Sequence, residues 1–315
     1  MNLILLQPSE LTVAATTSTS ATSSSSTSSD EAPSERTAVL AAGDARAKHI
    51  VKHLRKTTGE TVTVGIEGAH LYQATIVVLD NGSLELSLSQ QTHDDHTAQP
   101  RVTLLLAMPF PMRLKYLWPV VASMMVERVV VIQGSLSNPE FAKSRVLQPD
   151  TYLPLLREGL SQGGHTQLPT VEVAVDQPMS TIESLEGLLN KTDQQGDNSN
   201  TTTVKIFLDC GDETTVPPTV REIIMGQTKI LSTETPSAVI AIGPERGWTE
   251  QEAQLFAKAG FHAAALGPSI LRVDTAVISA ISLTQAALQE WCLKHYHSQH
   301  AEGEGSNNKR KHGED

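Results

Sequence analysis

The feature that most constrains this chain is the stretch from Val239 to Ala280, where two short apolar runs each end abruptly at a glycine-proline pair. The first run, Val239 to Ile242, is continuous and β-branched, which is typical of a strand covered on both faces. The second run, Ala263 to Leu266, is equally short, and helical periodicity follows each loop. The stretch therefore predicts strand, loop, helix, strand, loop, helix.

The two expected helices have their own boundary signals. Thr249 and Glu252 have the spacing of a capping box, and Gly260 is placed to end the helix that they begin. After the second loop, apolar residues recur at helical spacing from Asp274 onward. Two glycine loops thus follow two neighbouring strands. Ligands bind at this position in α/β sheets, although two ordinary tight turns would give the same pattern.

Three segments, IGPERGWTEQE, LGPSILR and VDTAV, occur here in order. Together they closely resemble the C-terminal signature of the 16S ribosomal RNA uridine-N3 methyltransferase family, within the SPOUT superfamily of S-adenosylmethionine-dependent RNA methyltransferases. The resemblance implies an α/β fold: a SPOUT-type knotted methyltransferase domain with a C-terminal trefoil knot, preceded by a small PUA-like β-barrel domain. It also implies a homodimer with the cofactor beside the interface.

The resemblance further implies the reaction, which is transfer of a methyl group from S-adenosylmethionine to N3 of a specific uridine in small-subunit ribosomal RNA. Such a transfer requires binding, alignment and removal of one proton, and needs no metal. The cofactor-binding residues that the resemblance implies are Leu208, Gly211, Ile242, Gly243, Pro244, Glu245, Gly247, Leu266, Gly267, Ile270, Leu271, Thr275 and Ala276.

Two residues are the expected catalytic pair. Arg272 matches an arginine of the family motif and is expected to stabilise the developing anion on the base or to hold a phosphate. Asp274 stands where the family usually has glutamate, and a carboxylate there accepts the proton or orients Arg272. Capping of the last helix is the alternative role for both Asp274 and Thr275.

Some positions depart from the family pattern. Arg246 replaces a usual glycine, Ser269 replaces a usual basic residue, and residues 121–127 lack the usual TELGV wording. Arg246 is expected either to contact RNA or to clash with the cofactor loop. Two alternatives therefore stay open. One is a SPOUT methyltransferase for another RNA position, and the other is an inactive RNA-binding ribosome-assembly factor that keeps the fold.

The front of the chain has a different pattern. Apolar residues alternate over 62–66, 72–78 and 84–88, with a hairpin signal at Asn81-Gly82. The segment from His49 to Arg55, followed by Thr58-Gly59-Glu60, resembles the PUA-like RNA-binding domain of the same family. A basic cluster in this region is expected either to contact RNA or to form a solvated helix face. The predicted RNA-binding residues are Arg46, Lys48, Lys52, Arg55 and Lys56 here, and Gln162, His165 and Arg246 further along.

From Val102 onward, strands and helices alternate, which predicts a mainly parallel sheet. The expected domains are residues 1–98, with a disordered Ser/Thr-rich insertion near 14–36, and residues 99–297, followed by a disordered tail over 298–315. The 315 residues suffice for two cores.

Composition limits the partners. A net charge of −11 argues against a protein that coats nucleic acid non-specifically. The two cysteines, Cys210 and Cys292, give no disulfide framework or zinc pattern.

We expect no metal at His93-Asp94-Asp95-His96, because adjacent ligands on a polar linker do not converge. No apolar run approaches the roughly 20 residues of a membrane helix. We expect a soluble cytoplasmic protein. An organelle that has its own ribosomes is the alternative location, but the Ser/Thr tract has no arginine before Arg36, unlike an organellar transit peptide.

Overall fold

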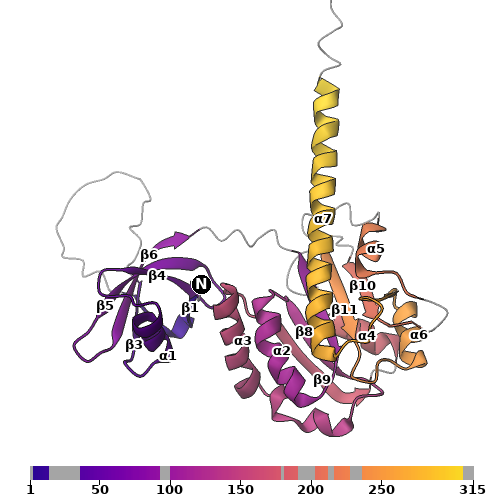
Figure 1. Ribbon diagram of the computed structural model, residues 1–315, viewed down its shortest axis with the longest axis horizontal. Helices are drawn as coiled ribbons and strands as arrows, with labels where there is room; N and C mark the ends of the chain where they lie inside the picture. The colour runs from indigo at the N-terminus through magenta and orange to yellow at the C-terminus, as the bar shows by residue number, and fades with distance from the viewer. Residues whose placement is uncertain are drawn as a thin grey trace, which may run out of the picture. The chain divides into compact units, whose positions relative to one another are not determined.

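The structure is a computed structural model, and it describes residues 3–13, 36–92, 100–178, 181–190, 203–211, 216–227 and 236–307. The chain divides into two compact units (Figure 1). The first comprises Met1–Asp95 with Leu160–Leu168, and the second comprises His96–Gly159 with Pro169–Asp315. Most of the predicted Ser/Thr insertion, the expected domain boundary at 98/99 and the His93–His96 segment lie outside the described residues.

The first unit is a six-stranded sheet in the order β1-β4-β5-β6-β3-β2. Most neighbours are antiparallel, and only β1 and β4 run parallel. The hairpin predicted at Asn81-Gly82 is confirmed, because it joins β5 to β6 with Gly82 at φ +78°. Its elements are β1 (Ile4–Leu6), the 3-10 helix η1 (Pro8–Glu10), β2 (Leu11–Val13), β3 (Arg36–Leu40), α1 (Ala45–Lys48), the π-helix η2 (His49–His53), β4 (Thr61–Ile66), β5 (Leu71–Val78) and β6 (Leu84–Thr92).

The alternating apolar residues of these strands explain the core of this unit. In a strand, every second side chain points to the same face. Val62, Val64 and Ile66 of β4 therefore reach one cluster with Ala74 and Ile76 of β5. Ile50 enters the same cluster from η2, which fixes the basic segment on the sheet while leaving its cations outside.

The second unit has a six-stranded sheet in the order β12-β10-β11-β7-β8-β9, and every pair is parallel. This confirms the predicted parallel sheet. The strands are β7 (Arg101–Ala107), β8 (Arg128–Gln133), β9 (Thr170–Pro178), β10 (Thr203–Leu208), β11 (Ser237–Ile242) and β12 (His262–Ala264). The helices are α2 (Pro111–Ser123), η4 (Pro139–Lys143), η5 (Arg145–Leu147), α3 (Pro149–Gly163), α4 (Ile182–Asn190), α5 (Val220–Met225), α6 (Glu250–Lys258) and α7 (Val273–Asn307).

Helices cover both faces of this sheet. Val239 and Ala241 of β11 pack in a cluster with Leu185 of α4 and Phe256 of α6. Ala238 points to the opposite face, into a cluster that contains residues of α5 and α7. This two-sided burial explains why the strands are continuous apolar runs.

Helix α7 extends beyond the sheet in Figure 1. It continues to Asn307. The disordered tail predicted over 298–315 stays a prediction. No proline lies between Val273 and Asn307, so each further residue adds a hydrogen bond to a helix that has already been nucleated by packing. Residues 308–315 lie outside the described part of the chain.

Residues 121–127, which lack the TELGV motif, form the last residues of α2 and the turn that follows it. Met125 lies at φ +55°, in the left-handed region where glycine is the usual residue. The amide of Val126 donates to Val121 and that of Met125 donates to Ala122, both at 3.1 Å, which is the hydrogen-bond pattern of a Schellman cap. The turn is therefore kept although its glycine is replaced.

Candidate functional site

Loops from neighbouring strands meet at one edge of the second unit's sheet. Strands β12, β10 and β11 lie side by side and run parallel, so their carboxyl ends share that edge. The loops that follow them span residues 209–211, 243–249 and 265–272. These loops contain most of the residues expected to bind the cofactor.

The loop after β11 is a tight turn that requires its glycines. The amide of Gly247 donates to the carbonyl of Pro244 at 2.9 Å, and Gly247 has φ +71°. A Cβ on Gly243 would lie 3.0 Å from the carbonyl carbon of Gly247, so a side chain there would force the turn apart. Ile242, Gly243 and Pro244 are buried, and they present the backbone of this turn at the sheet edge.

Glu245 turns toward the junction between β7 and α2. Its Oε1 accepts the backbone amide of Phe110 at 3.0 Å and lies 3.4 Å from Nη1 of Arg113. The carboxylate expected at the cofactor therefore holds the glycine loop to the start of α2. Phe110 and Arg113 were not predicted as site residues. The sequence carried no signal for them, because only the structure shows that β7 pairs with β11 and ends at the same edge.

A buried carboxylate supports the other end of this loop. The predicted capping box is confirmed, since Thr249 and Glu252 bond to each other reciprocally at the start of α6. Glu252 is buried, and its Oε1 also accepts the amide of Ser135 at 2.8 Å, just after β8. One side chain thus fixes the loops after two strands.

The loop after β12 exposes apolar residues. Gly267 has φ +151°, and Ile270 exposes 87% of its surface. Leu271 is exposed as well, whereas Leu208 and Leu266 pack against the cluster shared by α5 and α7. The expected apolar walls therefore comprise two anchored leucines and an exposed Ile270-Leu271 pair.

Gly211 stands in the loop after β10 with φ +69°. Its amide donates to Oδ1 of Asp209 at 3.1 Å, and the amide of Asp209 donates to Ala264 of β12 at 3.0 Å. The loop is thereby held against the neighbouring strand.

Arg272 and Asp274 form an ion pair at the start of α7. Nη2 of Arg272 lies 3.1 Å from Oδ2 of Asp274, and the two side chains are 67% and 18% exposed. The second carboxylate oxygen, Oδ1, is buried and accepts no hydrogen bond from the described residues. A buried acceptor without a donor is costly, so Oδ1 is the strained member of this pair.

Neither Asp274 nor Thr275 stands at the N-cap of α7, where the alternative capping role would place it. Helix α7 begins at Val273, so Asp274 and Thr275 lie within its first turn rather than at the N-cap. The amide of Ala276 donates to the carbonyl of Arg272 at 2.8 Å, which is the first helical bond. A carboxylate in the first turn still interacts favourably with the helix dipole.

Arg246 is exposed. Its side chain is therefore not buried among the three loops. Contact with RNA and a clash with the cofactor loop both stay predictions.

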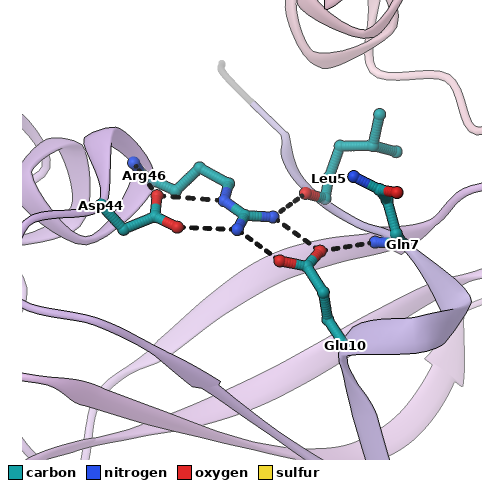
Figure 2. Close-up of polar contacts among 5 residues, drawn as sticks. All are labelled: Leu5, Gln7, Glu10, Asp44 and Arg46. Atoms are coloured by element: carbon teal, nitrogen blue, oxygen red, sulfur yellow. Dashed lines mark hydrogen bonds and ion pairs between the residues drawn. The ribbon is translucent and has the colours of Figure 1, made fainter.

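Arg46, in the first unit, is bonded within the protein. Figure 2 shows its guanidinium between Glu10 and Asp44, with a further bond to the Leu5 carbonyl. The five hydrogen bonds measure 2.6 to 3.1 Å. An arginine has five N–H donors, so none remains for a phosphate. This gives Arg46 a structural role, and its contact with RNA stays a prediction.

The same network shifts the acidities of its members. Hydrogen bonds from Arg46 lower the pKa of both Glu10 and Asp44. Hydrogen bonds to Glu10 and then to Asp44 raise the pKa of Arg46. All three groups are therefore held in their charged forms, as expected for a structural ion-pair network.

The other cations of the basic cluster are more open. Lys48, Lys52 and Arg55 are exposed, and no ion pair joins any of them to a described residue. Lys56 lies 3.1 Å from Glu60. Arg55 has φ +56°, an uncommon conformation for a non-glycine residue that turns the chain sharply after η2.

Gln162 and His165 group with the first unit rather than with the loops of the second. Their segment joins it through backbone bonds of 2.9 Å, from Leu3 to Ser161 and from Gly68 to Thr166. Gln162 is exposed and His165 is half-buried.

Among the residues that the structure describes, no group of three or more His, Cys, Asp or Glu side chains is arranged to hold a metal. Within the same ranges, no helix combines the length and the apolar character needed to span a membrane.

The parallel sheet, its helical layers and its glycine-rich edge define a class: an α/β domain of the kind that binds ligands at the carboxyl ends of its strands. A model of the family described as RNA methyltransferase domain matches residues 97–285, and the chain belongs to that family.

Individual relatives agree with this. Ribosomal RNA small subunit methyltransferase E of Treponema pallidum is 27% identical over 265 residues, covering 82% of this chain and 88% of the relative. Ribosomal RNA small subunit methyltransferase E 1 of Borreliella burgdorferi is 24% identical, covering 79% and 93%. A Ribosomal RNA small subunit methyltransferase E from Neisseria gonorrhoeae, bound to S-adenosyl methionine, has a similar fold, with a TM-score of 0.56, 20% identity and coverage of 80% and 92%.

Proposed function

We propose that this protein uses S-adenosylmethionine to methylate N3 of a uridine in small-subunit ribosomal RNA. Membership of the RNA methyltransferase domain family supports RNA methylation. The names of the two relatives support a ribosomal small-subunit target. The uridine N3 position rests on the resemblance of the three C-terminal motifs alone.

The observation that carries the proposal is the glycine-rich edge of the second sheet beside the Arg272–Asp274 pair. Gly243, Gly247 and Gly267 leave backbone groups free of side chains at this edge, as a nucleoside cofactor requires. Leu208, Leu266 and the exposed Ile270 offer apolar contacts to an adenosyl group. The residues present therefore fit S-adenosylmethionine.

When bound, S-adenosylmethionine supplies an electrophilic methyl group and a neutral thioether leaving group. The chain must hold the uracil in line and take one proton from N3. The carboxylate of Asp274, which is 18% exposed beside Arg272, is the group we propose to accept that proton. Arg272 then stabilises the negative charge that develops on the base, because its exposed guanidinium holds Asp274 by one hydrogen bond only.

The proposed architecture has three features beyond the two sheets described above: a knot, an RNA-binding barrel and a homodimer. We propose that the edge loops belong to a SPOUT-type trefoil knot, that the first unit is a PUA-like barrel which binds RNA through Lys48, Lys52 and Arg55, and that the active form is a homodimer. Sedimentation velocity tests the dimer. We propose that the protein acts in the cytoplasm, where its target ribosomes would be.

Isothermal titration with S-adenosylmethionine, compared with S-adenosylhomocysteine, is the first test. We expect micromolar binding of both, followed by loss of N3-methyluridine from the small-subunit RNA of a deletion strain. No binding to the folded dimer, alone or with the small subunit present, would contradict the proposal and favour an RNA-binding assembly factor. Binding of the cofactor with N3-methyluridine intact would point to another RNA position.

A further inference from the structure

Phe110 places an exposed aromatic ring at the edge that carries the glycine loops. It is the N-cap residue of α2, and 49% of its surface is exposed. Its ring meets that of Phe141 edge to face, with centroids 5.5 Å apart and an interplanar angle of 86°. Phe141 thus supports the ring on one side, while about half of the residue remains open.

The position of this ring is tied to the glycine loop. The backbone amide of Phe110 donates to Glu245 at 3.0 Å, and Arg113, one turn into α2, lies 3.4 Å from the same carboxylate. Glu245 belongs to the Gly243–Gly247 turn. Any ligand that touches both the turn and the ring therefore finds them held at a fixed spacing.

Exposed aromatic and basic residues occur on the helix and the loop that the ring joins. Tyr116 follows on α2 with 57% of its surface exposed. Lys115 and Arg246 are exposed too, and within the described ranges neither has an ion-pair partner. An exposed aromatic ring, with unpaired cations on the helix and the loop that it joins, matches the two parts of a nucleic acid, its base faces and its phosphates.

We propose that Phe110 is the stacking platform for an unpaired base of the RNA substrate, beside the cofactor loop. The inference rests on the proposed function, since it concerns how that site takes its substrate. A base inside a duplex hides N3 in its pairing edge, so it must be turned out before the methyl group can reach it. An extruded base is commonly held by stacking on an aromatic side chain.

Titration with a short oligouridylate tests the platform without cofactor. We expect Phe110→Ala to weaken binding by about ten- to a hundredfold, which is the range for loss of one base–aromatic stack. Phe110→Leu keeps an apolar contact with Phe141 but removes the ring, and should weaken binding almost as much. Phe110→Tyr should restore it. The matched control is Met112→Ala, which removes a more exposed apolar side chain from the same helix end and should change the affinity less than about twofold.

None of these substitutions removes the backbone amide that Glu245 binds, so the loop should stay in place. Binding of S-adenosylmethionine to Phe110→Ala should therefore equal that of the wild type. If the wild type binds no cofactor, the proposed function fails, whatever the oligouridylate titration gives. If the wild type binds cofactor and Phe110→Ala binds oligouridylate equally well, the stacking proposal fails alone.

A spectroscopic variant separates stacking from other effects. In Phe110→Trp, the added fluorescence relative to wild type should be quenched as oligouridylate binds, whereas that of Met112→Trp should not. Equal quenching of both variants would overturn a specific platform. If Phe110→Ala instead dissociates a dimer while leaving oligouridylate affinity unchanged, the ring packs against a second copy of the chain, and the proposal is overturned.

Discussion

Two arginine–carboxylate pairs, one in each unit, differ in how many of their hydrogen-bonding groups are used. Arg46 donates five hydrogen bonds, to Glu10, Asp44 and the Leu5 carbonyl. Arg272 donates one to Asp274, and the second oxygen of Asp274 is buried without a donor among the described residues. A motif or a charge run marks both arginines equally. The count of satisfied groups separates the structural pair from the one that is open to a ligand.

The largest effect should come from Arg272 and Asp274, whose hydrogen-bonding groups are only partly used. Arg272→Ala should lower the rate of methyl transfer by about 10²–10³-fold, because it removes charge stabilisation in the transition state. Single-turnover assays with small-subunit RNA measure the rate, and titration should show unchanged affinity for S-adenosylmethionine. Arg272→Lys is the matched control and should recover part of the rate. Equal loss of rate and of cofactor affinity would remove the catalytic role.

Arg46 should affect stability instead, because all of its hydrogen-bond donors are used by Glu10, Asp44 and the Leu5 carbonyl. Arg46→Ala leaves two partly buried carboxylates unpaired and should lower the free energy of unfolding of the first unit by about 2–3 kcal/mol. Urea denaturation followed by circular dichroism measures this. Lys48→Ala, an exposed neighbour, should cost less than about 0.5 kcal/mol. A stable Arg46→Ala protein with weakened RNA binding would reverse the distinction drawn here.

Acid should sharpen the same contrast, with a smaller effect. Because Arg46 lowers the pKa of Glu10 and Asp44, their contribution to stability is complete above the ordinary values of 4.5 and 3.8 and is lost as pH falls through the lowered values. The wild-type first unit should therefore lose stability below about pH 4.5 more steeply than Arg46→Ala. Thermal melts at pH 7, 4 and 3 measure the difference, and parallel curves would contradict it.

The smallest effect should come from the open cations beside Arg46. Lys52→Ala should weaken RNA binding about threefold to fivefold and reduce the slope of log affinity against log salt by about 0.7, because one phosphate contact is lost. Fluorescence anisotropy at several salt concentrations measures both. Lys56→Ala serves for comparison, since Lys56 already pairs with Glu60 and should change the slope less.

Periodicity and turn chemistry predicted the second unit well. The continuous runs of β7, β8 and β11 are buried on two faces, and local signals located the capping box of α6. These features depend on residues that are close in sequence. The resemblance likewise named residues in the three loops because their motifs are contiguous.

The contacts that could not be predicted from the sequence join residues that are far apart in the chain. A charge run counts cations, but it does not reveal that Glu10 lies opposite Arg46 across 36 residues. The cofactor motif contains Glu245, but it does not reveal that this side chain bonds to Phe110. Only the strand order brings such residues together.

The hydrogen bonds that hold the glycine loop have a consequence for folding. Ser135 and Glu252 are 117 residues apart, and Phe110 and Glu245 are 135 apart. Contacts of such high sequence separation close long loops, and the entropy cost of that closure must be met before the contacts stabilise the fold. The ligand-binding edge should therefore be among the last parts to assemble during refolding, and the recovery of cofactor binding should report completion of the native state rather than an intermediate.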